Sequence, residues 1–285
     1  MIIVEEFVRD HPAMAEIEAR VSTGEAIDFA GESAFFEKIV KSGLAQYAVN
    51  GALRRMSEDE DFQLGNFILA GSVQIWPFVV TPLFSISIVI RDPSMDEARV
   101  EAGAPRTFRL QPYASNTFIH VLQGTRAVLN HHRVQETAAD PVLVACGQTP
   151  LVSGTSVLVP ACTHAVSFDT QDVLITMDVT GPVTRATMPM FDSESLGLCG
   201  YISTDPTASR LELFTYTLAE FRQAESFDSV ARLTDHRDHY VRWNATRHLL
   251  RIDARRAREY VERALGDAHG EVRDAAQSTM NRFFS

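Results

Sequence analysis

The hydrophobic positions of the N-terminal region recur at a helical interval. Phe35 and Phe36 are followed by Ile39 and Leu44, and this spacing places all four side chains on one face of an α-helix. An acidic run closes the region, and we interpret it as a solvated turn. We therefore predict an N-terminal helical segment over residues 1–61.

From Phe62 onward the period changes to that of β-strands. The run Phe84–Ile90 alternates hydrophobic and polar residues, and other short β-branched or aromatic runs precede it. Seven further strands are expected at 107–110, 118–122, 126–134, 141–145, 156–159, 164–168 and 173–179. Short strands separated by turn residues predict an all-β sandwich or barrel, which we place at residues 62–188.

The strand pattern fades after Gly181-Pro182. Residues 192–206 are polar and are expected to form a connection. A helix is predicted at 209–224, because the hydrophobic residues from Leu211 to Phe221 are spaced by three, four and three positions. We interpret residues 189–228 as a linker and a helix that packs on the barrel.

The last part of the chain contains an internal repeat. Val241-Arg-Trp-Asn-Ala245 aligns with Val272-Arg-Asp-Ala-Ala276, and a Leu-x-Asp triplet precedes each copy. In such a pattern Asp caps a helix while Val and Ala pack inward. It resembles HEAT-like repeats and implies a helical extension over residues 229–285. Two copies are fewer than a freestanding solenoid needs, so we expect this tail to dock a protein partner or a second subunit in a homodimer.

Charge and cysteine content narrow the possible partners and compartment. The formal net charge is −11, although the stretch 226–285 carries 11 Arg and no Lys against nine Asp and Glu. An acidic body is poorly suited to binding a polyanion, which makes nucleic acid an unfavoured partner. Three widely spaced cysteines favour a reducing compartment. With no apolar run of about 20 residues to cross a membrane, we expect a soluble cytoplasmic protein.

Two motifs in the strand-rich region resemble those of a known superfamily. Gly154 is followed by five residues, Pro160 and, four positions later, His164. This spacing is similar to the second motif of the cupin superfamily, whose members are RmlC-like jelly rolls. The stretch Thr117-Phe-Ile-His-Val-Leu-Gln-Gly124 is similar to the end of the cupin first motif. The resemblance lies within 108–182. It implies an α+β chain with a cupin-like antiparallel β-barrel, or jelly roll, between the N-terminal helical segment and the HEAT-like extension.

The resemblance gives only part of the metal site of a cupin. Metal-binding cupins take two histidines and a carboxylate from the first motif and one histidine from the second, and that last position matches His164. The first-motif positions fall near Leu110, Pro112 and either Asn116 or Thr117. None of these is an ordinary metal ligand. The first motif is therefore degenerate, and a standard centre of three His and one Glu is absent.

Other histidines could rebuild a metal site. His131 and His132 are adjacent on a predicted strand, so alternation turns one of them inward, where it would join His164. His120 is a third candidate. If Thr117 faces inward, parity sends His120 outward unless a bulge intervenes. One divalent transition metal, Fe, Mn or Zn, is the cofactor that such a set would bind. The structural alternative, in which these histidines fill the core or lie on the surface, leaves the protein without a cofactor.

Further side chains are candidates for a pocket. Gln111, Asn116 and Thr117 are polar residues expected at the barrel mouth, and Cys162 shares strand parity with His164. We interpret these four as substrate-binding candidates and His164 as a candidate catalytic base.

Histidines of the helical repeat have a simpler interpretation. His236 and His239 lie in what we interpret as a polar turn rather than a zinc site, and His248 lies in the same repeat further along the chain.

Two functional hypotheses follow. In the first, the chain is a cupin-type enzyme acting on a small molecule in the barrel, such as an oxygenase or isomerase with a non-standard metal site, or an acid–base enzyme without metal. In the second, it is a metal-free binding or regulatory cupin whose helical tail docks a protein partner. Fold alone does not decide between them.

Overall fold

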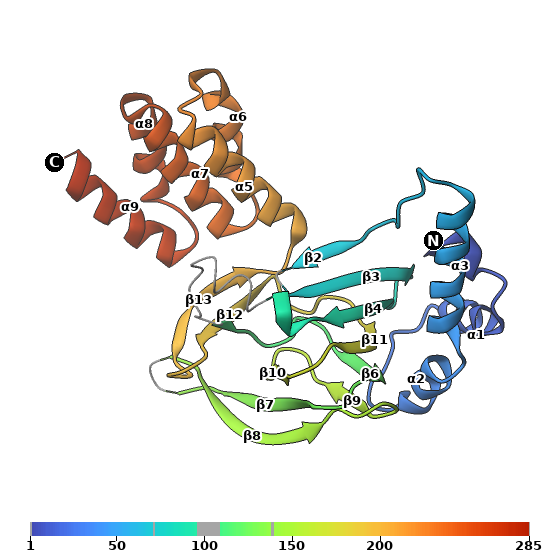
Figure 1. Ribbon diagram of the computed structural model, residues 1–285. Coiled ribbons are helices and arrows are strands. Elements are labelled where there is room, and N and C mark those ends of the chain that lie inside the picture. The colour runs from blue at the N-terminus through green and yellow to red at the C-terminus, as the bar shows by residue number, and fades with distance from the viewer. Residues whose placement is uncertain (1, 71, 96–108, 138–139, 285) are drawn as a thin grey trace. The chain divides into compact units, whose positions relative to one another are not determined.

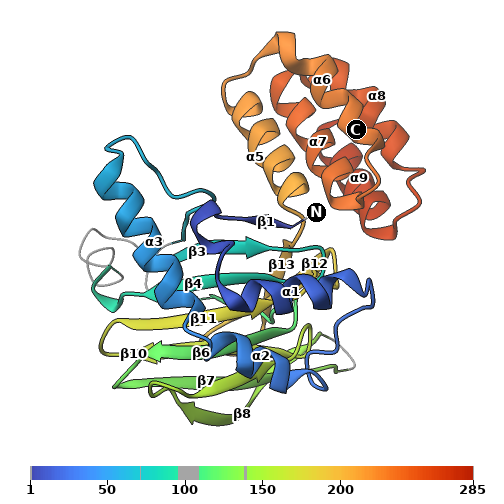
Figure 2. The same cartoon turned by 90° about the vertical axis from the view of Figure 1, so that its right-hand side faces the viewer.

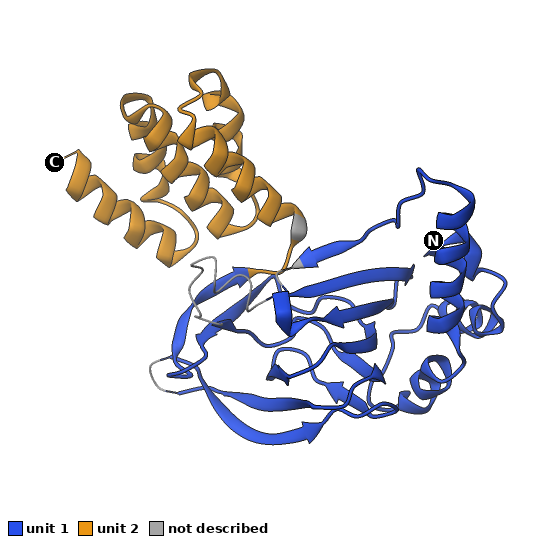
Figure 3. Ribbon diagram, in the orientation of Figure 1, with its two compact units in different colours: residues 1–202 blue, residues 203–285 orange. Residues whose placement is uncertain are grey.

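The computed structural model describes residues 2–70, 72–95, 109–137 and 140–284. The chain divides into two compact units, residues 1–202 and 203–285 (Figure 3). The first unit combines antiparallel sheets with helices, and the second is helical (Figure 1). The architecture is therefore α+β, with helices before and after the sheets in the sequence.

The described elements of the first unit begin with a short strand and three helices. The helices are α1 (Pro12–Ser22), α2 (Ser33–Val40) and α3 (Leu44–Glu58), and a 3-10 turn (Glu6–Val8) precedes them. The strands are β1 (Ile3–Val4), β2 (Ile68–Ala70), β3 (Val73–Val80), β4 (Ser85–Arg91), β5 (Arg109–Leu110), β6 (Thr117–Gln123), β7 (Ala127–Gln135), β8 (Val142–Pro150), β9 (Ser156–Val159), β10 (His164–Thr170), β11 (Leu174–Thr180), β12 (Thr187–Asp192) and β13 (Leu198–Ser203). Eight of these strands, β4 to β11, overlap strands predicted from the sequence. Positions 107 and 108 of the strand predicted at 107–110 lie outside the described residues.

The strand order is that of a double-sheet jelly roll. One sheet contains the neighbours β4, β11, β6 and β9, and another contains β10, β7 and β8. Strand β5 extends the second set, because Pro112 bridges to Ala165 and the Tyr113 amide donates to the His164 carbonyl at 3.2 Å. Two antiparallel four-stranded sets in this order make the pair of Greek keys of a jelly roll. The described strands form separate sheets, without a closed ring of hydrogen bonds.

Two differences from the predicted strands have local causes. Strand β8 continues to Pro150 instead of ending at Ala145, because a register shift opposite His131 and His132 absorbs an extra residue near Gly147, whose φ is +148°. The polar connection predicted at 192–206 is wrong in part, since it contains β13, which pairs with β12. Pro and Gly within these last two strands hid the strand pattern.

The N-terminal helices cover one face of the large sheet. Figure 2 shows α1, α2 and α3 in front of β3, β4, β11 and β6. Phe36 of α2 is fully buried between them, with its ring centroid 4.7 Å from that of Phe29, 6.2 Å from Phe84 and 5.6 Å from Phe118. The face predicted from Phe36 and Ile39 is thus the face of α2 that packs on the sheet. Leu44, predicted on the same helix, instead begins α3, because Gly43 with a φ of +82° separates the two helices.

The second unit is a set of helices. They are α5 (Pro206–Glu220), α6 (Phe227–Ala231), α7 (His239–Ile252), α8 (Ala254–Ala264) and α9 (Gly270–Phe283), with 3-10 turns at Ala224–Ser226 and Arg232–Asp235. Helix α5, predicted from the spacing of its apolar residues, contacts α7 within this unit. Its packing on the β-sheets stays a prediction.

The sequence repeat corresponds to a repeated contact. Arg242 donates to the carbonyls of His236 and Arg237, and Arg273, its counterpart in the second copy, donates to those of Asp267 and Ala268. Each arginine thus satisfies carbonyl groups in the loop before its own helix. The identification as HEAT-like repeats stays a prediction. Among the described helices, none has the length and hydropathy needed to cross a membrane.

Truncation of Phe36 is expected to destabilise the first unit strongly. A Phe36→Ala substitution leaves a cavity beneath α2 and should lower the free energy of unfolding by about 3–5 kcal/mol. Urea denaturation followed by circular dichroism measures the change. The half-exposed Phe67 is the matched control, and a Phe67→Ala variant should change the free energy by less than about 1 kcal/mol. Equal effects of the two substitutions would contradict the packing described.

Candidate functional site

A charged cluster lies on the inner face of the large sheet. Along β4 the even positions Ile86 and Ile88 pack toward the helices, so alternation turns Arg91 toward the second sheet. On the neighbouring strand β11, Asp178 faces the same way, because Met177 and Val179 pack in the core beneath the helices. Arg91 and Asp178 are both buried.

Short contacts join this cluster and link it to the second sheet. The Arg91 Nη2 atom lies 3.9 Å from Asp178 Oδ2, and Arg91 Nη1 donates to Thr176 Oγ1 at 3.2 Å. Thr176 Oγ1 in turn donates to Asp178 Oδ1 at 2.6 Å. The guanidinium carbon of Arg91 lies 3.7 Å from the ring centroid of Phe168 on β10. A cation–π contact therefore spans the gap between the sheets.

Burial dominates the ionisation of this cluster. It raises the pKa of Asp178, while the charge of Arg91 and the hydrogen bond from Thr176 oppose that rise. Burial also raises the pKa of Tyr113, and the charge of Arg91 opposes that rise. A buried ion pair has to be hydrogen-bonded to offset the loss of hydration, and Thr176 bonds to both members of this pair.

A cavity of about 530 Å³ opens beside Arg91. It borders β3, β4, β5, β7 and β10, so it lies where the first sheet meets the second. Its lining residues are Ser72, Val73, Arg91, Asp92, Pro93, Arg109, Leu110, His132, Val166, Ser167, Phe168, Thr170 and Ser193. Apolar walls with a few charged groups and an imidazole are typical of a small-molecule site.

His131 and His164 face the interior between the sheets. His131 lies opposite Val166 in the β7–β10 ladder, and Val166 belongs to the interior apolar cluster. His164 is two positions before Val166 on β10 and shares its face. Burial lowers the pKa of His131, and the nearby charge of His164 and then of His132 lowers it further. The ring of His131 is held by Thr149, whose Oγ1 lies 2.9 Å from Nε2.

His132 has a different position from its neighbour. It lies opposite Ala165 in the ladder and lines the cavity. Its Nδ1 atom is buried without a hydrogen-bond partner, and burial lowers its pKa. A neutral imidazole with an uncommitted ring nitrogen therefore borders the cavity near pH 7.

His120 lies away from the other three histidines. Its Nδ1 atom is 2.9 Å from Ser156 Oγ. Burial lowers the pKa of His120, and the negative charge of Glu37 on α2 partly opposes this shift. It therefore faces the helices, as strand parity from the inward-facing Thr117 predicts.

None of the four pocket candidates lines the cavity beside Arg91, and three of them make local contacts. Asn116 Oδ1 accepts from the Ala161 amide at 2.8 Å, and buried Thr117 donates to the Ser115 carbonyl. Cys162 has a φ of +63°, and its Sγ lies 3.0 Å from Thr184 Oγ1. Gln111 is exposed. These contacts hold the loops at one end of the sandwich.

The cupin metal set does not fit this interior. Leu110, at a first-motif position, packs with Leu143, Ala165 and Phe191, and Pro112 bridges to Ala165. Among the described residues of the first unit, no three His, Cys, Asp or Glu side chains lie close enough to hold one ion. His131 and His164 together supply two donors.

The sequence interpretation missed Arg91, Asp178 and Arg109. Asp178 and Arg109 lie within runs that were interpreted only as strands, and Arg91 lies one residue beyond the predicted run Phe84–Ile90. A charged residue at a strand position that alternation turns toward the interior is the signal that could have found Arg91 and Asp178, because a buried charge requires a partner.

Comparisons with known proteins give limited likenesses. No family model matches the sequence, and no curated protein matches it significantly. Similar solved structures include hydroquinone 1,2-dioxygenase in complex with Cd²⁺ and 4-hydroxybenzonitrile, with 13% identity, a TM-score of 0.27, and coverage of 37% of this chain and 62% of that one. A sugar phosphate isomerase from a cupin superfamily, from Silicibacter pomeroyi, has 14% identity, a TM-score of 0.26, and coverage of 47% and 78%. An RmlC-like cupin from Shewanella frigidimarina has 11% identity, a TM-score of 0.26, and coverage of 45% and 95%. At these values the likenesses identify no activity, and the jelly-roll order rests on the strand pairing itself.

Removing one partner of the buried ion pair should be far more costly than removing both. An Asp178→Asn variant leaves the Arg91 charge without its counter-charge and should lose about 3–5 kcal/mol of unfolding free energy. The double variant Arg91→Met with Asp178→Asn should lose clearly less than the sum of the two single changes. Urea denaturation of the four proteins in this double-mutant cycle measures the coupling. Strict additivity would show that the two side chains do not interact.

The lowered pKa of His131 should depend on His164. NMR titration of the histidine ring protons should give His131 a pKa below the ordinary value of about 6.5. In a His164→Asn variant that pKa should rise, because the like charge that disfavours protonation of His131 is removed. His248 in the second unit is the internal control, and its pKa should not move. An unchanged His131 pKa in the variant would contradict their proximity.

Proposed function

We propose that this chain is a cupin-type enzyme that acts on a small molecule bound in the cavity beside Arg91, with His132 as the acid–base group. The observation that carries this proposal is the cavity of about 530 Å³, in which the guanidinium groups of Arg91 and Arg109 and the imidazole of His132 border apolar walls. The jelly-roll strand order and the motif position of His164 support the cupin assignment.

The lining favours a substrate with an apolar body and an anionic group. The charge of Arg91 is balanced by Asp178, so Arg91 offers a ligand hydrogen-bond donors in a fixed position but little net charge. Arg109 is exposed and supplies a guanidinium fork that matches a carboxylate or phosphate. Asp92 also lines the cavity, but its Oδ1 accepts two bonds from Ser94. The apolar surface comes from the walls of β3, β5 and β10.

His132 is the proposed acid–base group of the cavity. Because its pKa is lowered by burial, the imidazole is neutral near pH 7 and can accept a proton from a substrate carbon or hydroxyl. Proton transfer of this kind is the step of an isomerase or lyase, and it needs no metal. The pair His131 and His164 provides too few donors for the usual cupin centre, so no step is assigned to an ion there.

A binding module is the alternative function, and one observation favours it. Helix α5 and the residue that follows it expose Leu213, Phe214 and Phe221, each with more than half of its surface accessible. Large exposed apolar side chains on one segment are typical of a protein-binding surface. In this alternative the cavity holds a ligand without turnover, and the helical unit docks a partner.

The proposed site is tested by ligand-induced stabilisation. A panel of small carboxylates and sugar phosphates is added to the full chain and the melting temperature is measured, since a ligand at 100 times its dissociation constant stabilises by about 2.7 kcal/mol. For a stabilising compound, Arg109→Ala should remove most of the shift, whereas the exposed Arg54→Ala on α3 should leave it intact.

Turnover separates the enzyme from the binding module. In the enzyme, His132→Asn should keep the thermal shift and lower the rate of proton exchange or product formation by about 10²- to 10⁴-fold. A wild-type chain that binds a compound without converting it would favour the module. The cavity proposal fails if no member of the panel stabilises the chain, or if Arg54→Ala and Arg109→Ala behave alike.

A further inference from the structure

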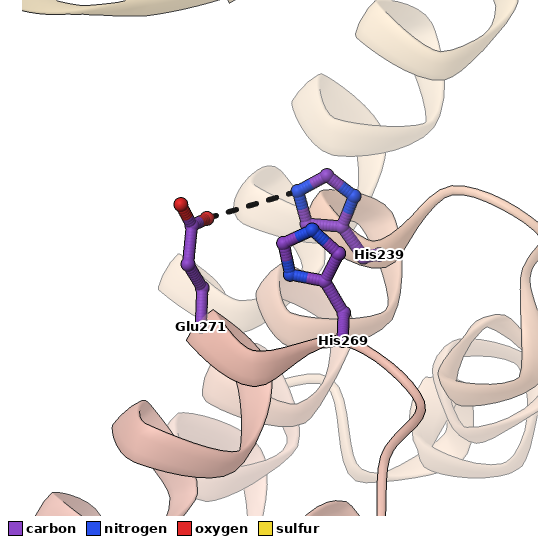
Figure 4. Close-up of side chains that lie close together, drawn as sticks. All are labelled: His239, His269 and Glu271. Atoms are coloured by element: carbon purple, nitrogen blue, oxygen red, sulfur yellow. Dashed lines mark ion pairs between the residues drawn. The ribbon is translucent and has the colours of Figure 1, made fainter.

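Three possible metal ligands meet in the helical unit, far along the chain from the cavity. His239 is the first residue of α7, His269 immediately precedes α9, and Glu271 lies in the first turn of α9. Figure 4 shows the two imidazole rings lying over each other beside the Glu271 carboxylate. The ring centroids are 3.6 Å apart with an interplanar angle of 7°, and His239 Nε2 lies 3.8 Å from Glu271 Oε2.

The loop that carries His269 is held firmly. Asp267 accepts from the His269 amide at 2.8 Å and from Arg242 Nε and Nη2 at 2.8 and 2.6 Å. Because Arg242 is one turn after His239 on α7, this ion pair fixes the two histidine-bearing segments against each other. The cluster is therefore a built arrangement instead of a chance meeting of surface side chains.

A ring nitrogen in the cluster lacks a partner. The Nδ1 atom of His269 is buried and makes no hydrogen bond in the described structure. Buried polar atoms in native proteins are nearly always satisfied by protein, water or an ion. A bound cation at this point would satisfy it.

The two arginines beside the cluster are already engaged by other groups. Arg242 pairs with Asp267, and Arg273 donates to the carbonyls of the loop before α9.

We propose that His239, His269 and Glu271 bind one divalent transition metal ion of the zinc class, which joins the first turns of α7 and α9. Two imidazoles and a carboxylate suit Zn²⁺, Co²⁺ or Ni²⁺ better than Mg²⁺ or Ca²⁺, which prefer all-oxygen sites. None of the three residues belongs to the cavity in the first unit.

The geometry needs small side-chain movements. One ligand atom from each residue lies within 4.8 Å of the others, whereas ligands of a tetrahedral zinc ion are about 3.3 Å apart at bond lengths of about 2.0–2.1 Å. Metals bind in the plane of an imidazole, so the stacked rings must rotate until their lone pairs converge. Glu271 is highly exposed and free to follow. A fourth position stays open to water.

Metal binding to the full chain tests the proposal. Protein purified without chelators and then dialysed against EDTA is titrated with ZnCl₂ by calorimetry and with CoCl₂ by visible absorption, which detects tetrahedral Co²⁺. All measurements use a His131→Asn/His164→Asn background as well as the wild-type chain, so that ions bound between the sheets are counted separately. We expect one equivalent that is retained in this background.

Single substitutions then locate the site. His239→Ala and His269→Ala should each weaken Zn²⁺ binding by at least about 100-fold, because loss of even an outer partner of a metal ligand costs about 10- to 100-fold. Glu271→Gln should abolish the tetrahedral Co²⁺ spectrum. His236→Asn is the matched control: it keeps an acceptor for the Asp238 amide, which His236 Nδ1 now provides, and should bind as the wild type does.

Each outcome decides the question. Circular dichroism checks that the variants are folded. If a histidine variant does not fold, the Glu271→Gln variant, which changes an exposed side chain, tests the site in its place. Absence of binding up to millimolar Zn²⁺, or binding that survives both histidine substitutions, overturns the site. Zn²⁺ binding that occurs in the wild-type chain but is lost in the His131→Asn/His164→Asn background also overturns the site. None of these results bears on ligand binding beside Arg91.

Discussion

The buried pair of Arg91 and Asp178 is the constraint around which the sandwich is arranged. Arg91 on β4 lies opposite Leu174 of β11, and its guanidinium reaches along β11 to within 3.9 Å of the Asp178 carboxylate. Thr176, between them on β11, bonds to both side chains. The guanidinium of Arg91 also stacks on the ring of Phe168, which connects this pair to β10 of the second sheet. Because charges this deep are tolerated only with partners in place, the pair couples the register of the first sheet to the position of the second. The cavity lies beside this pair, and Arg91 and Phe168 both line it.

The sequence predicted the strands well and the site poorly. Alternation and turn residues located β6, β7, β9, β10 and β11 to within a position or two at most ends, since these strands are short and each is buried on at least one face. The N-terminal helix face through Phe36 followed from period alone. These features depend on neighbours along the chain, which a single sequence displays.

The site depends on contacts between distant strands, and for that reason it was harder to see. Arg91 and Asp178 are far apart in the sequence, and no local pattern reports that they are adjacent in space. The cupin-like motif drew attention to His164, whereas the cavity is lined by His132, its opposite in strand parity. In the helical unit, the sequence around His239 is that of a polar turn, and its possible co-ligands belong to the next copy of the repeat. Only the folding back of α9 brings the three side chains together.

The arginine contacts repeated in the helical unit affect how that unit unfolds. Arg242 and Arg273 each bind carbonyls in the loop just before their own helix, so a copy organises that loop without help from distant parts of the chain. The ion pair of Arg242 with Asp267 also joins the first copy to the loop before the second. The sandwich, in contrast, is held by pairings between strands far apart in sequence, which favour all-or-none behaviour. Unfolding of the sandwich therefore breaks contacts between distant parts of the sequence, whereas unfolding of the helical unit breaks mostly contacts between helices that are near one another in the sequence.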